Sequence, residues 1–450
     1  MAFVMPKPQP DMPLQGGSAD GRTRSAGATS EGLGELPQSP QQGLEQHSTL
    51  VSGQSSTWSG RVPGSDRLPK PKTYIFQLDD SDIQEIELRA LSKFKELGLN
   101  GDEANKDNFD LPIHIRDKLE RAAIEVHQGC GVAILRGHDP TQHSPEDNLT
   151  LFLALSDHVG DVRGVQNRNG DMITHITDAR QWSAPYSMRH GIHTNEHLPF
   201  HNDMGTDILA LQVRQCAKEG GHTYVSSAGN IFCELAARRP DVIETLARAD
   251  WPIQVSASPP RFVNVPLLQW HRNRVLMSLD PGRLGLNPAI HRHFGREVVP
   301  PLTAAQREAM ALVSSIATEH RVCLDTRPGD IVFINNWALL HARDKYKDCD
   351  ESDDVEANGR RHLVRLWLRN SKLGWDIPAS MKIPWEAAFG PDGMGDKTSE
   401  NTWRKSEYRG SGLFTRNYPV VPPAEYKVPK YTSGSAAFLM EDDSDAALND

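Results

Sequence analysis

The chain has 450 residues, of which 38% are hydrophobic and 24% charged, and its formal net charge at pH 7 is −10. This acidity argues against a nucleic-acid partner, because phosphate binding favours a basic face. The sequence has no run of 18 apolar residues, so no membrane span is predicted.

The two ends of the chain differ in composition from its middle. Half of residues 1–70 are Gly, Ser, Pro or Gln, and such a segment buries too little apolar surface to offset the entropy lost on ordering. We therefore predict a disordered arm over residues 1–70, and deletion of residues 1–65 should leave activity intact. Residues 433–450 are predicted to be an acidic flexible tail, since five of the last ten residues are acids. The middle, residues 71–432, is expected to form one domain.

Short strands and longer helices alternate along this middle region. An apolar period of two predicts strands near residues 74–78, 131–136, 208–216, 274–278, 331–334 and 360–369. An apolar period of 3.6 predicts helices at residues 112–127, 148–159, 228–248 and 303–320. The expected fold class is mixed α/β, mainly β, with a double-stranded β-helix (jelly-roll) core flanked by helices.

Residues 163–199 lack a sustained helical or strand period. We predict a long loop of functional type there. Its aromatic and histidine residues are Trp182, Tyr186, His190, His193 and His197. Zinc binding by the three histidines is disfavoured, because no convincing fourth ligand lies close in the sequence.

His201 and Asp203 are two residues apart in the run Leu-Pro-Phe-His-Asn-Asp. If the pair lies on a strand, both side chains project from one face and can reach one ion. His341 supplies a third candidate ligand, and the 140 positions between His201 and His341 suit a sheet that folds back on itself. Two histidines and one carboxylate on one face of a metal are typical of non-haem Fe(II) centres, and they leave positions open for a cosubstrate and dioxygen.

An arginine-rich strand follows the third candidate ligand, at residues 360–369. Arg361 and Arg365 share a face with Leu363 and Trp367, which a solvated charged face would not normally include. We therefore expect both arginines to point into a partly enclosed site. A buried guanidinium needs an anion, which is either the carboxylate of a ligand or a carboxylate of the protein.

In these motifs the chain resembles the TauD/TfdA-like, or clavaminate-synthase-like, Fe(II)/2-oxoglutarate-dependent dioxygenases. The resemblance runs from about Gly131 to Leu368, and it rests on His-Asn-Asp at 201–203, Gly-Gly-His-Thr at 220–223, Arg-Pro-Gly-Asp-Ile-Val-Phe-Ile-Asn-Asn at 327–336, His341 and Arg-Arg-x-x-x-Arg at 360–365.

The resemblance implies a role for each matched residue. It implies that Fe(II) is bound by His201, Asp203 and His341, and that O2 and 2-oxoglutarate are cosubstrates. It implies that Thr223 and Arg361 contact 2-oxoglutarate, while Arg365 contacts the cosubstrate or an acidic group of the substrate. The connection at residues 344–359 looks longer than is usual in the family, so Arg360 and Arg365 remain alternative anchors for 2-oxoglutarate.

The implied activity is the oxidation of a small organic substrate with formation of succinate and CO2. Hydroxylation is the default outcome, but the triad does not separate it from desaturation, epoxidation or cyclisation. A tailoring step of specialised metabolism is favoured over a catabolic sulfonate or amino-acid oxygenase, because the long N-terminal arm does not resemble a compact catabolic member. A non-catalytic binding protein on this fold is disfavoured, because a non-catalytic relative could lose any of the matched residues, whereas His201, Asp203, His341 and Arg361 are all present. A hydrolase is disfavoured because neither Gly-x-Ser-x-Gly nor His-Glu-x-x-His occurs.

The five cysteines are widely spaced, odd in number and without a Cys-x-x-Cys pair. They are predicted to be reduced thiols of a cytoplasmic protein. The sequence leaves open whether the protein forms a homo-oligomer.

Overall fold

The structure is a computed structural model, and it describes residues 40–60, 70–167, 170–178, 189, 191–257, 260–284, 300–349, 360–390 and 416–423. Several predicted features lie outside the described residues: positions 1–39 of the arm, the loop residues Trp182, Tyr186 and His190, and the acidic tail at 433–450.

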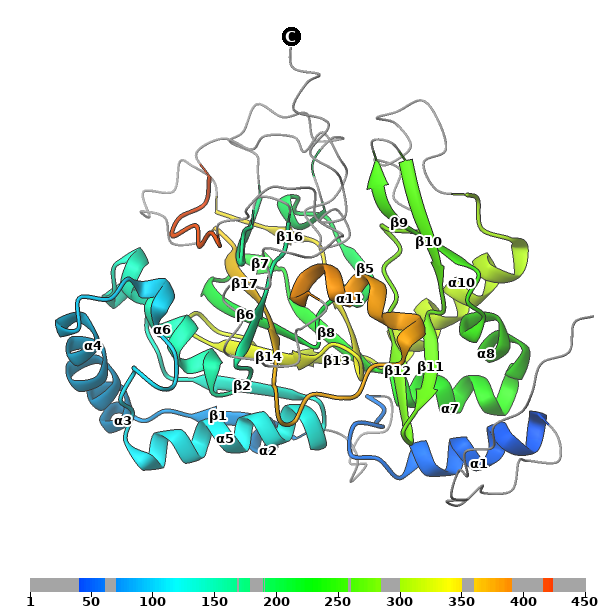
Figure 1. Cartoon of the computed structure of the whole chain (residues 1–450), viewed down its shortest axis with the longest axis horizontal. Helices are drawn as coiled ribbons and strands as arrows, with labels where there is room; N and C mark the ends of the chain where they lie inside the picture. The colour runs from blue at the N-terminus through cyan, green and yellow to red at the C-terminus, as the bar shows by residue number, and fades with distance from the viewer. Residues whose placement is uncertain are drawn as a thin grey trace, which may run out of the picture.

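Seven strands of the described part of the chain form the larger sheet (Figure 1). Their order is β1 (Ile75–Gln77), β2 (Val132–Arg136), β14 (Ile331–Asn335), β6 (Ile208–Gln215), β17 (His362–Arg369) and β3 (Val162–Gly164), and β4 (Ile173–Thr177) also pairs with β17. β1 and β2 are parallel, whereas the other neighbouring strands are antiparallel. Strands that are distant in the sequence therefore lie side by side.

A smaller antiparallel sheet contains, within the described residues, four strands. Their order is β13 (Val322–Leu324), β8 (Thr223–Ser227), β15 (Leu339–Arg343) and β5 (Leu198–His201). Two-stranded ribbons are formed by β9 (Trp251–Ala257) with β10 (Pro260–Val265), β11 (Leu268–His271) with β12 (Arg274–Met277), and β7 (Glu219–Gly220) with β16 (Tyr346–Lys347). The predicted mixed α/β class is confirmed.

Helices lie in two groups on either side of the sheets (Figure 1). The first group lies against the larger sheet and includes α2 (Pro71–Tyr74), α3 (Asp80–Gln84), the π-helix η1 (Glu85–Leu91), α4 (Ser92–Glu96), α5 (Ile113–Gln128) and α6 (Pro145–Asp157). The second group lies near the ribbons and includes α1 (Pro40–Ser52), α7 (Ala228–Arg238), α8 (Pro240–Ala247) and α10 (Ala304–Glu319). The helix α11 (Lys382–Phe389) and the short 3-10 turns η2 (Gly101–Glu103), η3 (Pro140–Gln142), η5 (Gly191–His193) and η6 (Ala379–Met381) complete the described helical elements.

The apolar core is divided by the larger sheet, and β17 contributes to both sides. Leu363 and Trp367 pack into one buried cluster together with residues of the smaller sheet. Val364 and Leu366 pack into another cluster, under α5 and α6. The alternation predicted for this strand is confirmed, because successive strand residues face opposite sides of a sheet.

Two predicted elements differ from the observed ones. The helix expected at 228–248 is broken between α7 and α8, where Arg239 has φ −145° and ψ 64°. The cause is Pro240, which disfavours the helical conformation of the residue before it and is well placed as a first helical residue. The expected loop at 163–199 contains the strands β3 and β4 and the start of β5, which are too short to give a clear period.

The prediction that residues 1–70 are a disordered arm is wrong for residues 40–60. The helix α1 packs against α7, and Val51 is fully buried. Trp58 is 1% exposed, and its indole N–H donates a hydrogen bond to the Cys130 carbonyl at 3.0 Å. This polar, Gly- and Ser-rich segment is ordered by a few large apolar side chains that reach the core.

Among the described residues, no helix is both long and apolar enough to cross a membrane. The five cysteines are all free.

Candidate active site

His201 and His341 lie opposite each other on neighbouring strands. His201 is the last residue of β5, His341 is the central residue of β15, and the two are paired directly in the antiparallel register. Asp203 lies beyond the end of β5, in a loop. The pair His201 and Asp203 is therefore not brought together by the period of one strand, as the spacing suggested.

Two buried asparagines hold the loop that carries Asp203. The Asn202 side-chain amide donates to the carbonyls of Asn336 at 2.7 Å and Leu339 at 3.0 Å. The Asn336 side chain accepts from the Asp203 N–H at 3.0 Å and donates to the Asp203 carbonyl at 2.7 Å. The loop is thus fastened to the turn that precedes β15, the strand that carries His341.

The donor atoms of the three side chains converge. Oδ1 of Asp203 is 3.7 Å from Nε2 of His201 and 3.7 Å from Nε2 of His341. Nδ1 of His201 lies 2.8 Å from the Pro199 carbonyl, so Nδ1 donates this hydrogen bond and the Nε2 lone pair is left for a metal. One atom from each residue lies within 4.8 Å of the others, which is compatible with joint binding of one ion.

The second oxygen of Asp203 is used within the protein. Oδ2 accepts hydrogen bonds from Nη1 of Arg365 and from the indole N–H of Trp367, each at 2.9 Å. Burial alone would raise the pKa of the Asp203 carboxyl, but Arg365, the two histidines and the Trp367 hydrogen bond hold it well below its usual range. Burial and the neighbouring His201 lower the pKa of His341 to about 3. A charged carboxylate and a neutral imidazole are the protonation states that metal binding requires.

All the predicted site residues line one cavity. They are His201, Asp203, Thr223, His341, Arg361 and Arg365, together with aliphatic side chains from β4, β5, β6 and β17. Arg360 is among the described residues but does not line this cavity. The structure therefore brings the three predicted metal ligands and both predicted arginines to the same cavity.

Arg361 has a buried donor that no described residue satisfies. Its side chain donates from Nε to the Gly221 carbonyl at 3.2 Å, while Nη1 is buried and has no hydrogen-bond partner. Burial lowers the pKa of Arg361 to about 10, and the neighbouring Arg343 acts in the same direction. A buried guanidinium donor without a partner is costly, so an anionic ligand would stabilise it.

Gly221 provides the space that Arg361 occupies. Its φ is +72°, which disfavours other residues, and a Cβ atom at this position would lie 2.9 Å from Cδ of Arg361. The Gly-Gly-x-Thr motif therefore brings the backbone close to the arginine, while Thr223, two residues later, lines the cavity.

Arg365 is held by protein groups on two sides. Besides its bond to Asp203, it donates from Nε to Oε1 of Gln166 at 2.8 Å. Gln166 is fully buried, and its own amide donates to the Arg365 carbonyl at 3.0 Å. Arg365 therefore faces Asp203, whereas the resemblance implied a contact with the cosubstrate or with an acidic group of the substrate.

The sequence had given no role to Trp367, Gln166 or Arg343. Trp367 was detectable, because it lies two residues from Arg365 on the same face of β17 and so points to the same side of the sheet. Gln166 and Arg343 carried no local signal. Arg343 donates to the carbonyls of Gly191 at 3.3 Å and Thr194 at 2.8 Å, which fixes the segment leading into β5.

Comparisons with known proteins agree with this geometry. The family model of the taurine catabolism dioxygenase TauD, TfdA family matches residues 93–367. The taurine hydroxylase-like protein SAT17 of Stachybotrys chartarum is 31% identical over 332 residues, covering 71% of this chain and 81% of that protein. FR-33289 synthase of Streptomyces rubellomurinus is 27% identical over 323 residues, covering 69% of this chain and 88% of the synthase.

A solved structure with a related fold is an asparagine oxygenase in complex with Fe(II), 3-hydroxyasparagine and succinate. It superposes with a TM-score of 0.51 at 15% sequence identity, covering 66% of this chain and 95% of that one. The match of the family model extends over more than half of the chain and includes the metal triad and both arginines. The chain therefore belongs to the TauD/TfdA family of dioxygenases.

Proposed function

We propose that this protein is an Fe(II)/2-oxoglutarate-dependent dioxygenase that oxidises a small organic substrate in a tailoring step of specialised metabolism. The observation that carries the proposal is the convergence of His201, Asp203 and His341 on the cavity that Thr223 and Arg361 also line. Membership of a dioxygenase family supports the same reaction type.

The donor set suits non-haem iron. Two imidazole nitrogens and one carboxylate oxygen make up the facial set that is typical of Fe(II) oxygenases. Asp203 offers Oδ1 as a single donor, because Arg365 and Trp367 occupy Oδ2. When bound, the iron supplies the oxidative chemistry, with 2-oxoglutarate and O2 as cosubstrates and succinate and CO2 as products.

Arg361 is the proposed anchor for 2-oxoglutarate. Its unsatisfied Nη1 donor lies in the wall of the cavity that contains the triad, and a carboxylate of the cosubstrate would accept its hydrogen bond. The hydroxyl-bearing Thr223 is the proposed second contact. Arg360 is disfavoured as an alternative because it does not line the cavity within the described part of the chain.

Arg365 is proposed to position Asp203 rather than to bind the cosubstrate. Its hydrogen bonds to Asp203 and Gln166 fix the direction in which the carboxylate points and keep the carboxylate charged. Partners that orient a metal ligand in this way commonly affect metal affinity by about 10- to 100-fold.

The two sheets are proposed to be the halves of a double-stranded β-helix. Along the chain, the strands β5, β6, β8, β14, β15 and β17 alternate between the smaller and the larger sheet, with β13 as a further strand of the smaller one. We further propose that the catalytic domain, expected at 71–432, also includes α1 and the segment up to Trp58, which contribute buried side chains.

A tailoring role is supported by the similarity to FR-33289 synthase, whose name denotes the making of a compound. A catabolic sulfonate or amino-acid oxygenase is the alternative, supported by the name of the taurine hydroxylase-like relative. Turnover assays with sulfonates and amino acids test the catabolic alternative, because a catabolic enzyme should couple their oxidation to succinate formation.

An anaerobic titration of the metal-free protein with Fe(II) and 2-oxoglutarate tests the proposed centre. The native protein should develop the visible charge-transfer absorption of an iron-chelated 2-oxoacid, and the Asp203→Ala variant should lose both this absorption and turnover. Coupled succinate formation at the native rate by Asp203→Ala would refute the triad. Absence of the absorption in well-folded native protein would favour a non-catalytic binding protein.

A further inference from the structure

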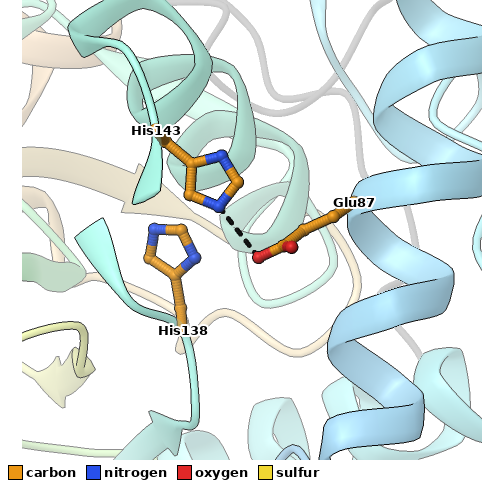
Figure 2. A group of neighbouring side chains, drawn as sticks. All are labelled: Glu87, His138 and His143. Carbon is orange, nitrogen blue, oxygen red and sulfur yellow. Dashed lines mark hydrogen bonds and ion pairs between the residues drawn. The ribbon is translucent and has the colours of Figure 1, made fainter. Parts of the chain in front are cut away.

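Three further side chains that suit a metal ion converge outside the active-site cavity. They are Glu87, His138 and His143, here called the Glu87 cluster, and one donor atom of each lies within 4.8 Å of the others. Figure 2 shows them pointing toward one another from three segments. Glu87 belongs to η1, His138 follows β2, and His143 lies between η3 and α6.

The tautomer of His138 is set by Asn148. The Asn148 side-chain amide donates to the carbonyls of Pro140 at 2.8 Å, His143 at 3.2 Å and Ser144 at 3.2 Å. Its Oδ1 must therefore be the atom that lies 2.9 Å from Nε2 of His138, so Nε2 carries the hydrogen and donates it. In the neutral imidazole, Nδ1 of His138 is then left with a free lone pair.

The Nδ1 lone pair of His138 is directed at the Glu87 carboxylate, which is also a hydrogen-bond acceptor (Figure 2). Nδ1 of His138 faces the Glu87 carboxylate and the His143 ring (Figure 2). Among the described residues, the His138 side chain forms its hydrogen bond through Nε2, with Asn148, and none is found at Nδ1. Nε2 of His143 lies 2.8 Å from Oε1 of Glu87. Burial lowers the pKa of His138, which keeps its ring neutral. The Nδ1 lone pair of His138, the Glu87 carboxylate and the His143 imidazole therefore meet at a point where one cation could contact all three (Figure 2).

The side chains of the cluster are also held in place by neighbouring residues. His138 is 8% exposed, and Asn148, which orients its ring, is 2% exposed. The backbone of His138 packs against Gly329, where φ is +92° and a Cβ atom would lie 1.7 Å from the His138 carbonyl oxygen. The rings of His138 and His143 are stacked, with centroids 4.9 Å apart. Such a donor set, with an outer hydrogen bond fixing a ligand ring, is characteristic of protein metal sites.

We propose that Glu87, His138 and His143 bind a divalent first-row transition-metal ion through one carboxylate oxygen, Nδ1 and Nε2, respectively. Metal bonds of about 2.0–2.1 Å in a tetrahedral site place neighbouring donors about 3.3 Å apart, so the Glu87–His143 contact needs to open only slightly. His143 must also exchange the tautomer that donates from Nε2 to Glu87 for the one with its hydrogen on Nδ1, so that the Nε2 lone pair binds the ion. The Glu87 side chain is 27% exposed, which leaves access for a water molecule as a further ligand. The ion would fasten the helical segment η1 to the connection between β2 and α6.

The test must separate this site from the catalytic triad. We would titrate metal-free protein with Co2+ and Zn2+ in a His201→Ala/Asp203→Ala background, and count bound metal after equilibrium dialysis. This background should still bind one equivalent, with the visible absorption of nitrogen-ligated Co2+ and a higher melting temperature. Adding His143→Ala or Glu87→Gln should abolish the bound equivalent and the metal-dependent rise in melting temperature.

His114→Ala is the matched control, because His114 forms an exposed His–Asp contact with Asp82 but belongs to no three-ligand cluster among the described residues. This variant should bind metal like its parent. His143→Ala in the otherwise native enzyme should keep coupled turnover and lose one of two metal equivalents. No bound metal in the triad-deficient background, or binding that survives both His143→Ala and Glu87→Gln, would overturn the proposal, whatever the outcome for the catalytic iron.

Discussion

The two carboxylate oxygens of Asp203 have different surroundings. Oδ1 faces the two histidines, whereas Oδ2 accepts hydrogen bonds from Arg365 and Trp367. The carboxylate is thereby kept charged, and only Oδ1 faces the two histidines. The residues that create this asymmetry both lie on β17, two positions apart.

Replacing Trp367 with Phe should weaken Fe(II) binding by about 10-fold while the fold is kept, because the indole N–H is lost but most of the ring volume remains. The measurement is an anaerobic Fe(II) titration. Trp337→Phe is the control, since the Trp337 indole is also buried but donates to Asp207. Equal Fe(II) affinity in the native protein and Trp367→Phe would show that this hydrogen bond does not tune the ligand.

Replacing Arg361 with Ala should raise the 2-oxoglutarate concentration needed for half-maximal turnover by about 10- to 100-fold, because a charge-assisted hydrogen bond contributes about 1.5–3 kcal/mol. Succinate formation at varied 2-oxoglutarate measures the effect. The neighbouring Arg360→Ala should behave like the native enzyme. If Arg360→Ala shows the larger change, the anchor is displaced by one residue.

At the scale of elements, α1 and Trp58 extend the fold toward the N-terminus. Val51 packs with the α7, α8 and α10 cluster, and Trp58 packs in the cluster that also contains Val132 and Trp367. The segment therefore joins two parts of the core. Deletion of residues 1–65, which the composition suggested would be harmless, removes both contacts.

A protein lacking residues 1–39 should keep its stability, whereas one lacking residues 1–60 should be strongly destabilised. Trp58→Ala alone should lower the free energy of unfolding by about 3–5 kcal/mol, because a large buried side chain is removed. Denaturant unfolding provides the measurement. The control is Leu50→Ala, at a side chain that is 54% exposed, with an expected change within about 0.5 kcal/mol. Equal stability of the two truncated proteins would contradict a structural role for α1.

At the scale of the whole molecule, the sheets and their covering helices bury several histidines in the neutral form. Burial lowers the pKa of His158 to about 4, with Lys106 acting in the same direction. Burial also lowers the pKa of His175 to about 4, against an opposing hydrogen bond to the Pro419 carbonyl. Both groups have an ordinary pKa of 6.5 when exposed, so the unfolded chain binds protons that the folded protein does not.

The contribution of these two histidines to the free energy of unfolding should therefore be complete above pH 6.5 and should fall as the pH drops from 6.5 to about 4. Each of the two histidines should contribute about 1.4 kcal/mol per pH unit within this window. Denaturant unfolding of the metal-free protein at several pH values measures how steeply the free energy of unfolding changes with pH. His158→Gln should reduce this slope by the contribution of one histidine. An unchanged slope in His158→Gln would place the proton uptake elsewhere.

Local chemistry made several features predictable from the sequence. The alternation along β17 placed Arg365 and Trp367 on one face, because the side-chain period of a strand is fixed by its backbone. The helix α10 was predicted at nearly its observed bounds, where Thr303 and Gln306 form a capping box. The types and spacing of His201, Asp203 and His341 indicated a metal site before any geometry was known.

The sequence by itself thus determined the residue types of the candidate site, the main helices and strands and the face of β17 on which Arg365 lies, since these depend on neighbouring residues. Only the tertiary structure decided that Asp203 lies in a loop held by Asn202 and Asn336, and that Arg365 faces Asp203. It also decided that Trp58 is buried and that His143 meets Glu87. These contacts join residues that are distant in the chain, so their energies depend on how the sheets and helices pack and leave no periodic signal in the sequence.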